Sequence, residues 1–237
     1  MSINAMTIAN RAVLVTGANR GIGHALVQEA LRRGATRVHA GARQTLTTLD
    51  DRIAPLTLDV TDAAQVQTAA ENVATLDLLI NNAGLGFHDD ITNRAVLERH
   101  LAVNLFGTFG VTQAFLPLLT RSHGAIVNVL SISASAPLRD VPAYSIAKAA
   151  AFNLTQSLRA LLAGRGVRVH AVVTGPVDTE MTRGLNVPKA SPQSVAQAIF
   201  DGVENGAEDI FADPVSVAVA TSRRTSTAKA RERGSAA

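Results

Sequence analysis

The chain has 237 residues, 47% of them hydrophobic, and a formal net charge of +3 at pH 7. This length fits a single domain with a sizeable core. The absence of cysteine excludes disulfides and thiolate metal sites, and makes the cytoplasm the expected location. Neither a signal peptide nor a run of about 18 apolar residues is recognisable, so we expect no membrane contact.

The positive charge is concentrated at the C-terminal end. Residues 221–237 carry a charge of +4, which leaves about −1 for the first 220 residues. This balance predicts no basic surface for nucleic acid. No two of the six histidines are spaced like metal ligands on one helix, so no metal site is expected either. We predict one domain over residues 1–220 and a basic, disordered tail over 221–237.

Short β-branched apolar runs alternate with longer segments of helical periodicity, as is typical of βαβ units. Pro117 and two nearby glycines weaken the end of the third predicted helix. The fold class is therefore α/β, a Rossmann-type doubly wound parallel sheet of about seven strands with helices on both faces. The strands are expected over 12–16, 37–42, 55–58, 76–80, 125–130, 167–173 and 209–211. The helices are expected over 21–33, 62–74, 93–119, 142–163 and 192–204, with Asp62 and Ser191 as N-caps and Gly34 as a C-cap.

The first predicted strand runs directly into a glycine-rich loop and a helix. Free N–H groups and the partial positive charge of a helix N-terminus attract phosphate, and glycines allow its close approach. Three glycines alone can form an ordinary turn, but the flanking strand and helix favour a dinucleotide pyrophosphate site. The loop reads Thr16-Gly17-Ala18-Asn19-Arg20-Gly21-Ile22-Gly23.

The end of the second predicted strand indicates which dinucleotide binds. NAD sites carry an acidic residue about 20 positions beyond the glycines, and this acid would repel a 2′-phosphate. Ala42 occupies that position here, and Arg43 beside it offers a planar guanidinium for the phosphate, with Arg20 as a second cation. NADP(H) is therefore expected rather than NAD(H). The alternative is that both arginines are solvated surface residues.

Tyr144 is the only tyrosine, and Lys148 follows it by four residues on one face of a predicted helix. A phenol titrates near ~10, so acid–base work at neutral pH needs a nearby cation such as Lys148. The alternative is a simple surface pair.

The glycine spacing G-x-x-x-G-x-G, together with the Tyr-x-x-x-Lys pair, resembles the short-chain dehydrogenase/reductases over most of the chain. The resemblance implies that Ser131 hydrogen-bonds the substrate oxygen and that Asn104 holds a water linked to the lysine. Each residue could instead be a local cap or a helix-bending residue. The sequence departs from the family at Thr174, usually proline, which puts the loop beside the nicotinamide in doubt, and at Leu130, often serine. The implied cofactor contacts are Gly17, Asn19, Arg20, Gly21, Ile22, Gly23, Arg43, Asp59, Val60, Asn82, Ala83, Gly84, Tyr144, Lys148, Val177 and Thr179.

The implied reaction is hydride transfer between nicotinamide and a small-molecule carbonyl or secondary alcohol, with Tyr144 as general acid/base. The family also implies a homodimer or homotetramer formed through the helices at 93–119 and 142–163, although the same small residues could simply pack on the sheet. The alternatives are a non-catalytic NADP(H)-binding sensor or regulatory protein, an interaction protein that uses the tail, or an epimerase or dehydratase. The expected substrate wall is Leu85, Phe87, Ser133, Leu138, Arg139 and Met181.

Overall fold

The computed structural model describes residues 6–44 and 46–222. In this part of the chain, one sheet of seven parallel strands has the order β3-β2-β1-β4-β5-β6-β7. The chain moves outward from β1 to β3 and then returns to β4, so the strand order reverses between β1 and β4 and opens a crevice at their carboxyl ends. The predicted doubly wound parallel sheet is confirmed. The strands are β1 Ala12–Thr16, β2 Arg37–Ala42, β3 Ile53–Thr57, β4 Leu78–Asn81, β5 Ala125–Val129, β6 Arg168–Val173 and β7 Asp209–Phe211.

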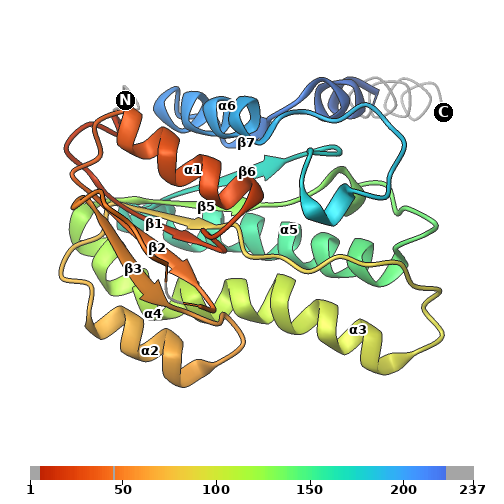
Figure 1. Ribbon diagram of the computed structural model, residues 1–237, viewed down its shortest axis with the longest axis horizontal. Helices are drawn as coiled ribbons and strands as arrows, with labels where there is room; N and C mark the ends of the chain where they lie inside the picture. The colour runs from red at the N-terminus through yellow and green to blue at the C-terminus, as the bar shows by residue number, and fades with distance from the viewer. Residues whose placement is uncertain (1–5, 45, 223–237) are drawn as a thin grey trace, which may run out of the picture.

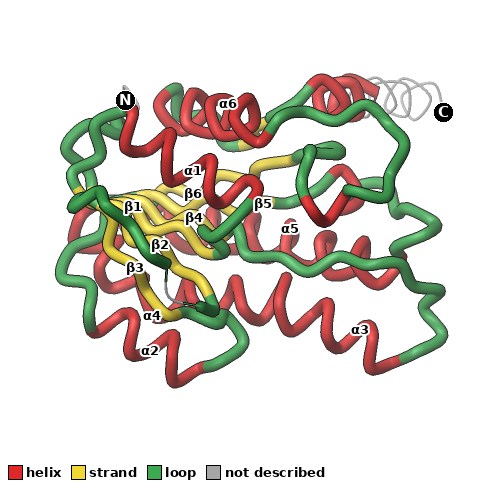
Figure 2. The backbone as a smooth tube through the Cα atoms, viewed as in Figure 1, coloured by secondary structure: helices red, strands yellow, loops and turns green. Residues whose placement is uncertain are grey.

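Helices cover both faces of the sheet (Figures 1 and 2). Successive strand residues point to opposite faces, so Val13 and Val15 pack with α1 and α6, whereas Leu14 packs with α2, α4 and α5. The helices are α1 Gly21–Arg32, α2 Ala63–Glu71, α3 Arg94–Leu101, α4 Thr108–Ser122, α5 Pro142–Leu162 and α6 Pro192–Glu204.

The predicted helix ends follow the expected capping chemistry. The Asp62 carboxylate accepts from the N–H groups of Ala64 and Gln65 at 3.0 and 3.1 Å. Ser191 caps α6, and Gly34 adopts a φ of +83° just after α1. These three local signals therefore position α1, α2 and α6 as the sequence predicts.

The third predicted helix is longer and less regular than expected. It is continuous from α3 to α4 through a π-helical segment, Ala102–Gly107, and it passes Pro117 to end at Ser122. A proline costs a helix about 3 kcal/mol, whereas burying one large apolar side chain stabilises by about 1.5–3 kcal/mol. Phe115, Leu118 and Leu119 are all buried around this proline, so packing outweighs the break.

This long helix also corrects the expectation that no segment resembles a membrane span. Arg94–Ser122 is 29 residues long with a window of mean hydropathy 1.4, so length and composition alone would let it cross a membrane. Core helices of soluble proteins pass the same test, and 39% of this window is buried within the protein. Because Val111 and Phe115 lie in the core beneath the sheet, this is weak evidence for a membrane.

The end of the described chain contains a helical segment that the sequence analysis missed. Residues 214–222 are helical and follow β7 directly. The domain boundary predicted at residue 220 falls inside this segment. The rest of the predicted basic tail, residues 223–237, lies outside the described residues.

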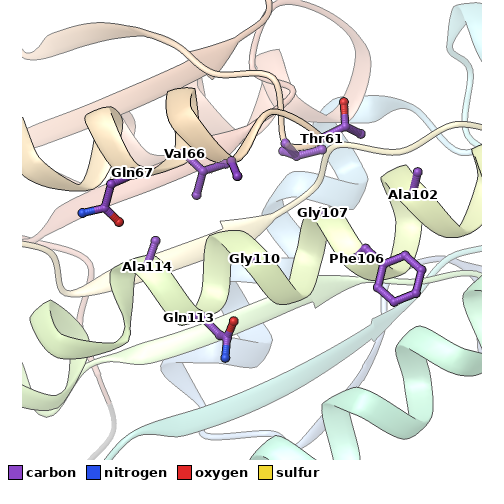
Figure 3. A pocket seen from close by; sticks show the side chains of 11 residues that line it. Thr61, Val66, Gln67, Ala102, Phe106, Gly107, Gly110, Gln113 and Ala114 are labelled. Carbon is purple, nitrogen blue, oxygen red and sulfur yellow. The ribbon is translucent and has the colours of Figure 1, made fainter.

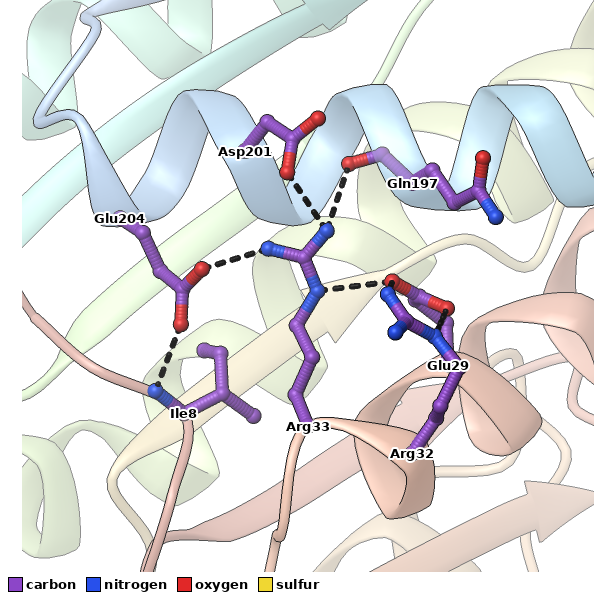
Figure 4. Close-up of polar contacts among 7 residues, drawn as sticks. All are labelled: Ile8, Glu29, Arg32, Arg33, Gln197, Asp201 and Glu204. Carbon is purple, nitrogen blue, oxygen red and sulfur yellow. Dashed lines mark hydrogen bonds and ion pairs between the residues drawn. The ribbon is translucent and has the colours of Figure 1, made fainter.

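Arg33, at the C-terminal end of α1, binds Glu29 of the same helix and joins it to α6 through Asp201 and Glu204 (Figure 4). Its guanidinium lies 2.7 Å from Glu29, 2.6 Å from Asp201 and 2.5 Å from Glu204, and only 11% of its side chain is exposed. Hydrogen bonds from Arg32 and from Arg33 lower the pKa of Glu29, against the effect of burial. This cluster holds together the two helices that cover the Val13 and Val15 face of the sheet.

The variant Arg33→Met should lower the free energy of unfolding by about 2–4 kcal/mol, because it removes the bonds to Asp201 and Glu204 that join α1 to α6 as well as one partner of the buried Glu29 carboxylate. Urea denaturation of Arg33→Met and of the control Arg32→Met measures this. Arg32 also binds Glu29 but bonds no described residue of α6, and it is 63% exposed, so its loss should cost about 1 kcal/mol and less than that of Arg33. The pKa of Glu29 is lower in the folded protein than in the unfolded chain. The stability that Glu29 contributes is therefore fully present above its pKa in the unfolded chain, and it is lost as the pH falls through its pKa in the folded protein. Equal losses in the two variants would contradict the role of Arg33 in joining α1 to α6.

Candidate functional site

The loop between β1 and α1 can be built only with glycine at key positions. Gly17 and Gly21 have φ angles of +66° and +54°, a region that other residues rarely adopt. A Cβ on Gly23 would lie 2.0 Å from the carbonyl oxygen of Gly17. The first turn of α1 holds no acidic residue. The loop therefore presents the N-terminus of α1 to the crevice as a cradle that fits a pyrophosphate.

Thr16 and Asn82 bind the two central strands together at their carboxyl ends. The Thr16 hydroxyl oxygen accepts from the N–H groups of Asn82 and Ala83 at 3.0 Å each, and the Asn82 side chain donates to the Thr16 carbonyl oxygen at 2.9 Å. A Cβ on Gly17 would lie 3.0 Å from Ala83 Cα, so the two loops touch. The structure thus places the predicted Asn82-Ala83-Gly84 turn directly beside the glycine loop.

The two arginines expected to bind the 2′-phosphate have different surroundings. Arg43 follows β2 and is exposed, and no described residue forms an ion pair with it. Arg20 instead pairs with Glu180, in a turn that follows β6. The sequence analysis missed this pair because 160 residues separate its members. Of the two, Arg43 is therefore the cation left available to a phosphate.

The remaining expected cofactor contacts surround the same crevice. Val60 follows β3 and packs on the π-helical segment, where a Cβ on Gly107 would lie 2.7 Å from it. The Asp59 carboxylate accepts from both the N–H and the hydroxyl of Thr61, so it is held locally. On the opposite side, the methyl group of Thr179 lies 3.1 Å from the Cβ position of Gly21. Val177 is buried just before Thr179.

Tyr144 and Lys148 lie on the first turns of α5, and Ser131 follows β5. A side-chain hydrogen bond joins Tyr144 and Ser131. The Lys148 ammonium donates to the Val129 carbonyl oxygen at 2.9 Å and lies 5.6 Å from the centre of the Tyr144 ring. The Ser131 hydroxyl oxygen also accepts from Ser133 N–H. Ser131 therefore acts as a local cap, as the alternative proposed, and contacts Tyr144 as well. The structure brings the three predicted residues together.

Burial sets the charge states of this group. It raises the pKa of Tyr144 to about 12, although the hydrogen bond with Ser131 acts the other way. Burial also lowers the pKa of Lys148 to about 8. At neutral pH the phenol therefore keeps its proton and the ammonium keeps its charge. Such an arrangement can donate a proton to a carbonyl oxygen and stabilise the phenolate that remains.

Asn104 lies in the π-helical segment and holds the loop in front of Tyr144. Its side chain donates to the carbonyl oxygens of Leu85 and His100 at 2.8 and 3.0 Å, and accepts from Leu85 N–H at 3.2 Å. Single π-helical turns often occur at functional sites. The family resemblance implies that Asn104 holds a water linked to Lys148. In the structure, the Asn104 side chain positions the backbone at Leu85.

His100 is a buried neighbour of the site that the sequence analysis missed. It is fully buried, and its ring lies 4.4 Å from Phe87 and 6.4 Å from Tyr144, centre to centre. Its Nδ1 bonds the Val96 carbonyl oxygen at 2.9 Å, so this nitrogen carries a proton. The spacing of four residues before Asn104 could have placed His100 on the same helical face.

A separate groove of about 520 Å³ lies between α2 and the start of α4 (Figure 3). Its lining includes Val66, Gln67, Phe106 and Gln113 and none of the predicted catalytic residues. It also includes Val60, so the groove lies on the Val60 side of the expected cofactor contacts and away from Tyr144. Within the described residues, no group of three or more His, Asp or Glu side chains could hold a metal ion.

Comparisons with known proteins agree with this geometry. A family model described as short chain dehydrogenase matches residues 11–190. Estradiol 17-beta-dehydrogenase 2 of Mus musculus is 34% identical over 199 residues, which cover 77% of this chain and 52% of that protein. An uncharacterized oxidoreductase of Staphylococcus epidermidis is 32% identical over 81% of this chain and 90% of its own. The chain thus spans about half the length of the mammalian relative.

The fold has solved counterparts as well. A short chain dehydrogenase from Burkholderia cenocepacia J2315 in complex with NADP superposes with a TM-score of 0.89 at 35% identity. The match covers 96% of this chain and 99% of that one. The family model, the parallel sheet and the Ser131–Tyr144–Lys148 group agree: the chain belongs to the short-chain dehydrogenase family of oxidoreductases.

Proposed function

We propose that this protein is an NADP(H)-dependent dehydrogenase/reductase that transfers hydride between nicotinamide and a carbonyl or secondary alcohol. The observation that carries the proposal is the contact of Tyr144 with Ser131 and of its ring with the buried Lys148 ammonium. The glycine cradle fits the dinucleotide, and the similar Burkholderia cenocepacia protein is described in complex with NADP.

The chain's own residues carry the proton. The glycine loop at Gly17, Gly21 and Gly23 would hold NADPH, which when bound would supply a hydride for the carbonyl carbon. Ser131 and Tyr144 donate hydrogen bonds to the carbonyl oxygen, and Tyr144 passes its proton to that oxygen as negative charge develops there. Lys148, held by the Val129 carbonyl oxygen, stabilises the phenolate until solvent returns a proton. In alcohol oxidation the same residues act in reverse.

The variant Tyr144→Phe should lower kcat for ketone reduction by about 10²-fold or more, because it removes the proton donor and keeps the ring. The NADPH dissociation constant should change less than about threefold, which serves as the control for folding. Steady-state NADPH consumption and fluorescence titration provide the two values. Unchanged turnover in the variant would rule out Tyr144 as the acid. Intact NADPH binding with no turnover by the native protein would favour a non-catalytic sensor.

The pH profile should reflect two groups. Lys148 must be charged to assist, and its pKa is lowered to about 8, so ketone reduction should be level below that pH and fall above it. Tyr144 is the only tyrosine and tryptophan is absent, so phenolate absorbance reports its titration directly. Because burial raises the pKa of Tyr144 to about 12, the free protein should show no phenolate near neutral pH. A phenolate signal at pH 7 would contradict this assignment.

The variant Arg43→Ala should raise the NADPH dissociation constant about tenfold or more and leave that of NADH nearly unchanged, because it removes the cation proposed for the 2′-phosphate. Arg20→Ala should have a smaller effect, since Glu180 already engages Arg20. Nicotinamide fluorescence gives the two dissociation constants. Arg94→Ala serves as the control, because Arg94 lies on α3 with 89% of its side chain exposed. Tighter binding of NADH than of NADPH by the native protein would overturn the preference.

We also propose that the chain forms a homodimer or homotetramer through α4 and α5. These helices lie next to each other beneath the sheet in Figure 1. Their outer surface exposes apolar side chains at Phe109 on α4 and Ile146 on α5, 39% and 45% exposed. Phe106, 61% exposed in the preceding π-helical segment, lies at the neighbouring groove against α2 and not on this surface. A second copy would remove this apolar surface from water.

A further inference from the structure

Four large apolar side chains are exposed on two segments that flank Tyr144. Leu138 lies just before α5 and is 44% exposed. Met181, Leu185 and Val187 lie between β6 and α6 and are 50%, 52% and 47% exposed. Single exposed apolar residues are ordinary, whereas a group around a reactive residue indicates a ligand surface. We call these four residues the apolar rim.

Two of the rim residues lie close to Tyr144 or to its neighbour in α5. A Cβ on Gly86 would lie 3.2 Å from Met181 Sδ and 3.2 Å from Tyr144 Cδ2, so the sulfur and the phenol ring face each other across this glycine. Leu138 N–H donates to the hydroxyl of Ser145, the residue next to Tyr144, at 3.1 Å. Leu185 lies four residues beyond Met181, and its N–H donates to the Thr182 carbonyl oxygen at 3.0 Å.

The segment that carries three rim residues returns to its starting point. Val177 and Ala190 form a parallel bridge, and Asp178 N–H donates to the Ala190 carbonyl oxygen at 2.8 Å. Residues 178–189 therefore project from the carboxyl end of β6, at the end of the molecule where α5 begins (cyan in Figure 1). This projection carries Met181, which faces the Tyr144 ring across Gly86, together with Leu185 and Val187.

Several charges around the rim are already engaged. Arg20 neutralises Glu180, and the Asp89 carboxylate accepts from Ala143 N–H at the start of α5, at 3.2 Å. Lys148 points inward to a carbonyl oxygen. Arg139 and Arg183 are exposed on the same two segments and would favour an acidic ligand, but solvated surface arginines are the norm.

We propose, on the basis of the hydride-transfer function above, that the substrate is an uncharged ketone or secondary alcohol with a bulky apolar body. Its oxygen binds Ser131 and Tyr144, and its apolar body packs against the rim. Met181 and Leu185 are then specificity-determining residues. Because packing removes hydrocarbon from water, binding strengthens with each methylene that the rim covers.

A series of methyl ketones of increasing chain length, reduced with NADPH, tests the substrate class. We expect kcat/KM to rise about two- to fourfold per methylene until the rim is covered. A ketone of equal length that ends in a carboxylate should react more slowly than its uncharged counterpart. Met181→Ser and Leu185→Ser should flatten the series. Leu161→Ser, which removes a 74% exposed leucine near the far end of α5, should leave its slope unchanged.

Two results would overturn the proposal: a series that is flat in the native protein, or a preference for the carboxylated ketone, which would point to Arg139 and Arg183. Binding of the same ketones to the protein–NADPH complex, followed by nicotinamide fluorescence, separates this inference from the function itself. Affinity that rises with chain length without turnover would support the apolar rim and reject hydride transfer. Affinity independent of length would reject the rim.

Discussion

The hydrogen bonds between Thr16 and the Asn82-Ala83 turn are the constraint on which the crevice depends. They join β1 and β4 where the strand order reverses, the point at which an open α/β sheet binds ligands. The glycine loop follows Thr16 directly, and the loop held by Asn104 follows Asn82. One pair of strand ends thus positions both the phosphate cradle and the backbone in front of Tyr144.

A second constraint is the burial of Lys148 against the sheet. Its bond to Val129 at the end of β5 fixes the ammonium beside the Tyr144 ring, and Ser131 follows the same strand. Burial makes both the phenolate and the ammonium costlier than in water. The protonated phenol is therefore the resting state, and the charge on Lys148 matters most after the proton has left. These charge states at neutral pH suit the proposed donation of a proton to a carbonyl oxygen.

Local signals made much of the architecture predictable from the sequence. The caps at Asp62, Ser191 and Gly34, the glycine loop and the four-residue spacing of Tyr144 and Lys148 each depend on neighbours within about one helical turn. Contacts between distant segments were not readable. The Arg20–Glu180 pair, the support of Leu85 by Asn104 and the packing of His100 require the folded chain. The helix predicted to end at residue 119 runs on to Ser122, because buried neighbours offset the local penalty of Pro117.

The most direct test of the central claim follows a labelled hydride. The protein is incubated with an apolar ketone and NADPH that carries deuterium on the transferred position of its nicotinamide, and the alcohol is analysed by mass spectrometry. The account predicts an alcohol labelled at its carbinol carbon with the native protein, and almost none with Tyr144→Phe. An unlabelled product, or no product while NADPH binds normally, would contradict the account.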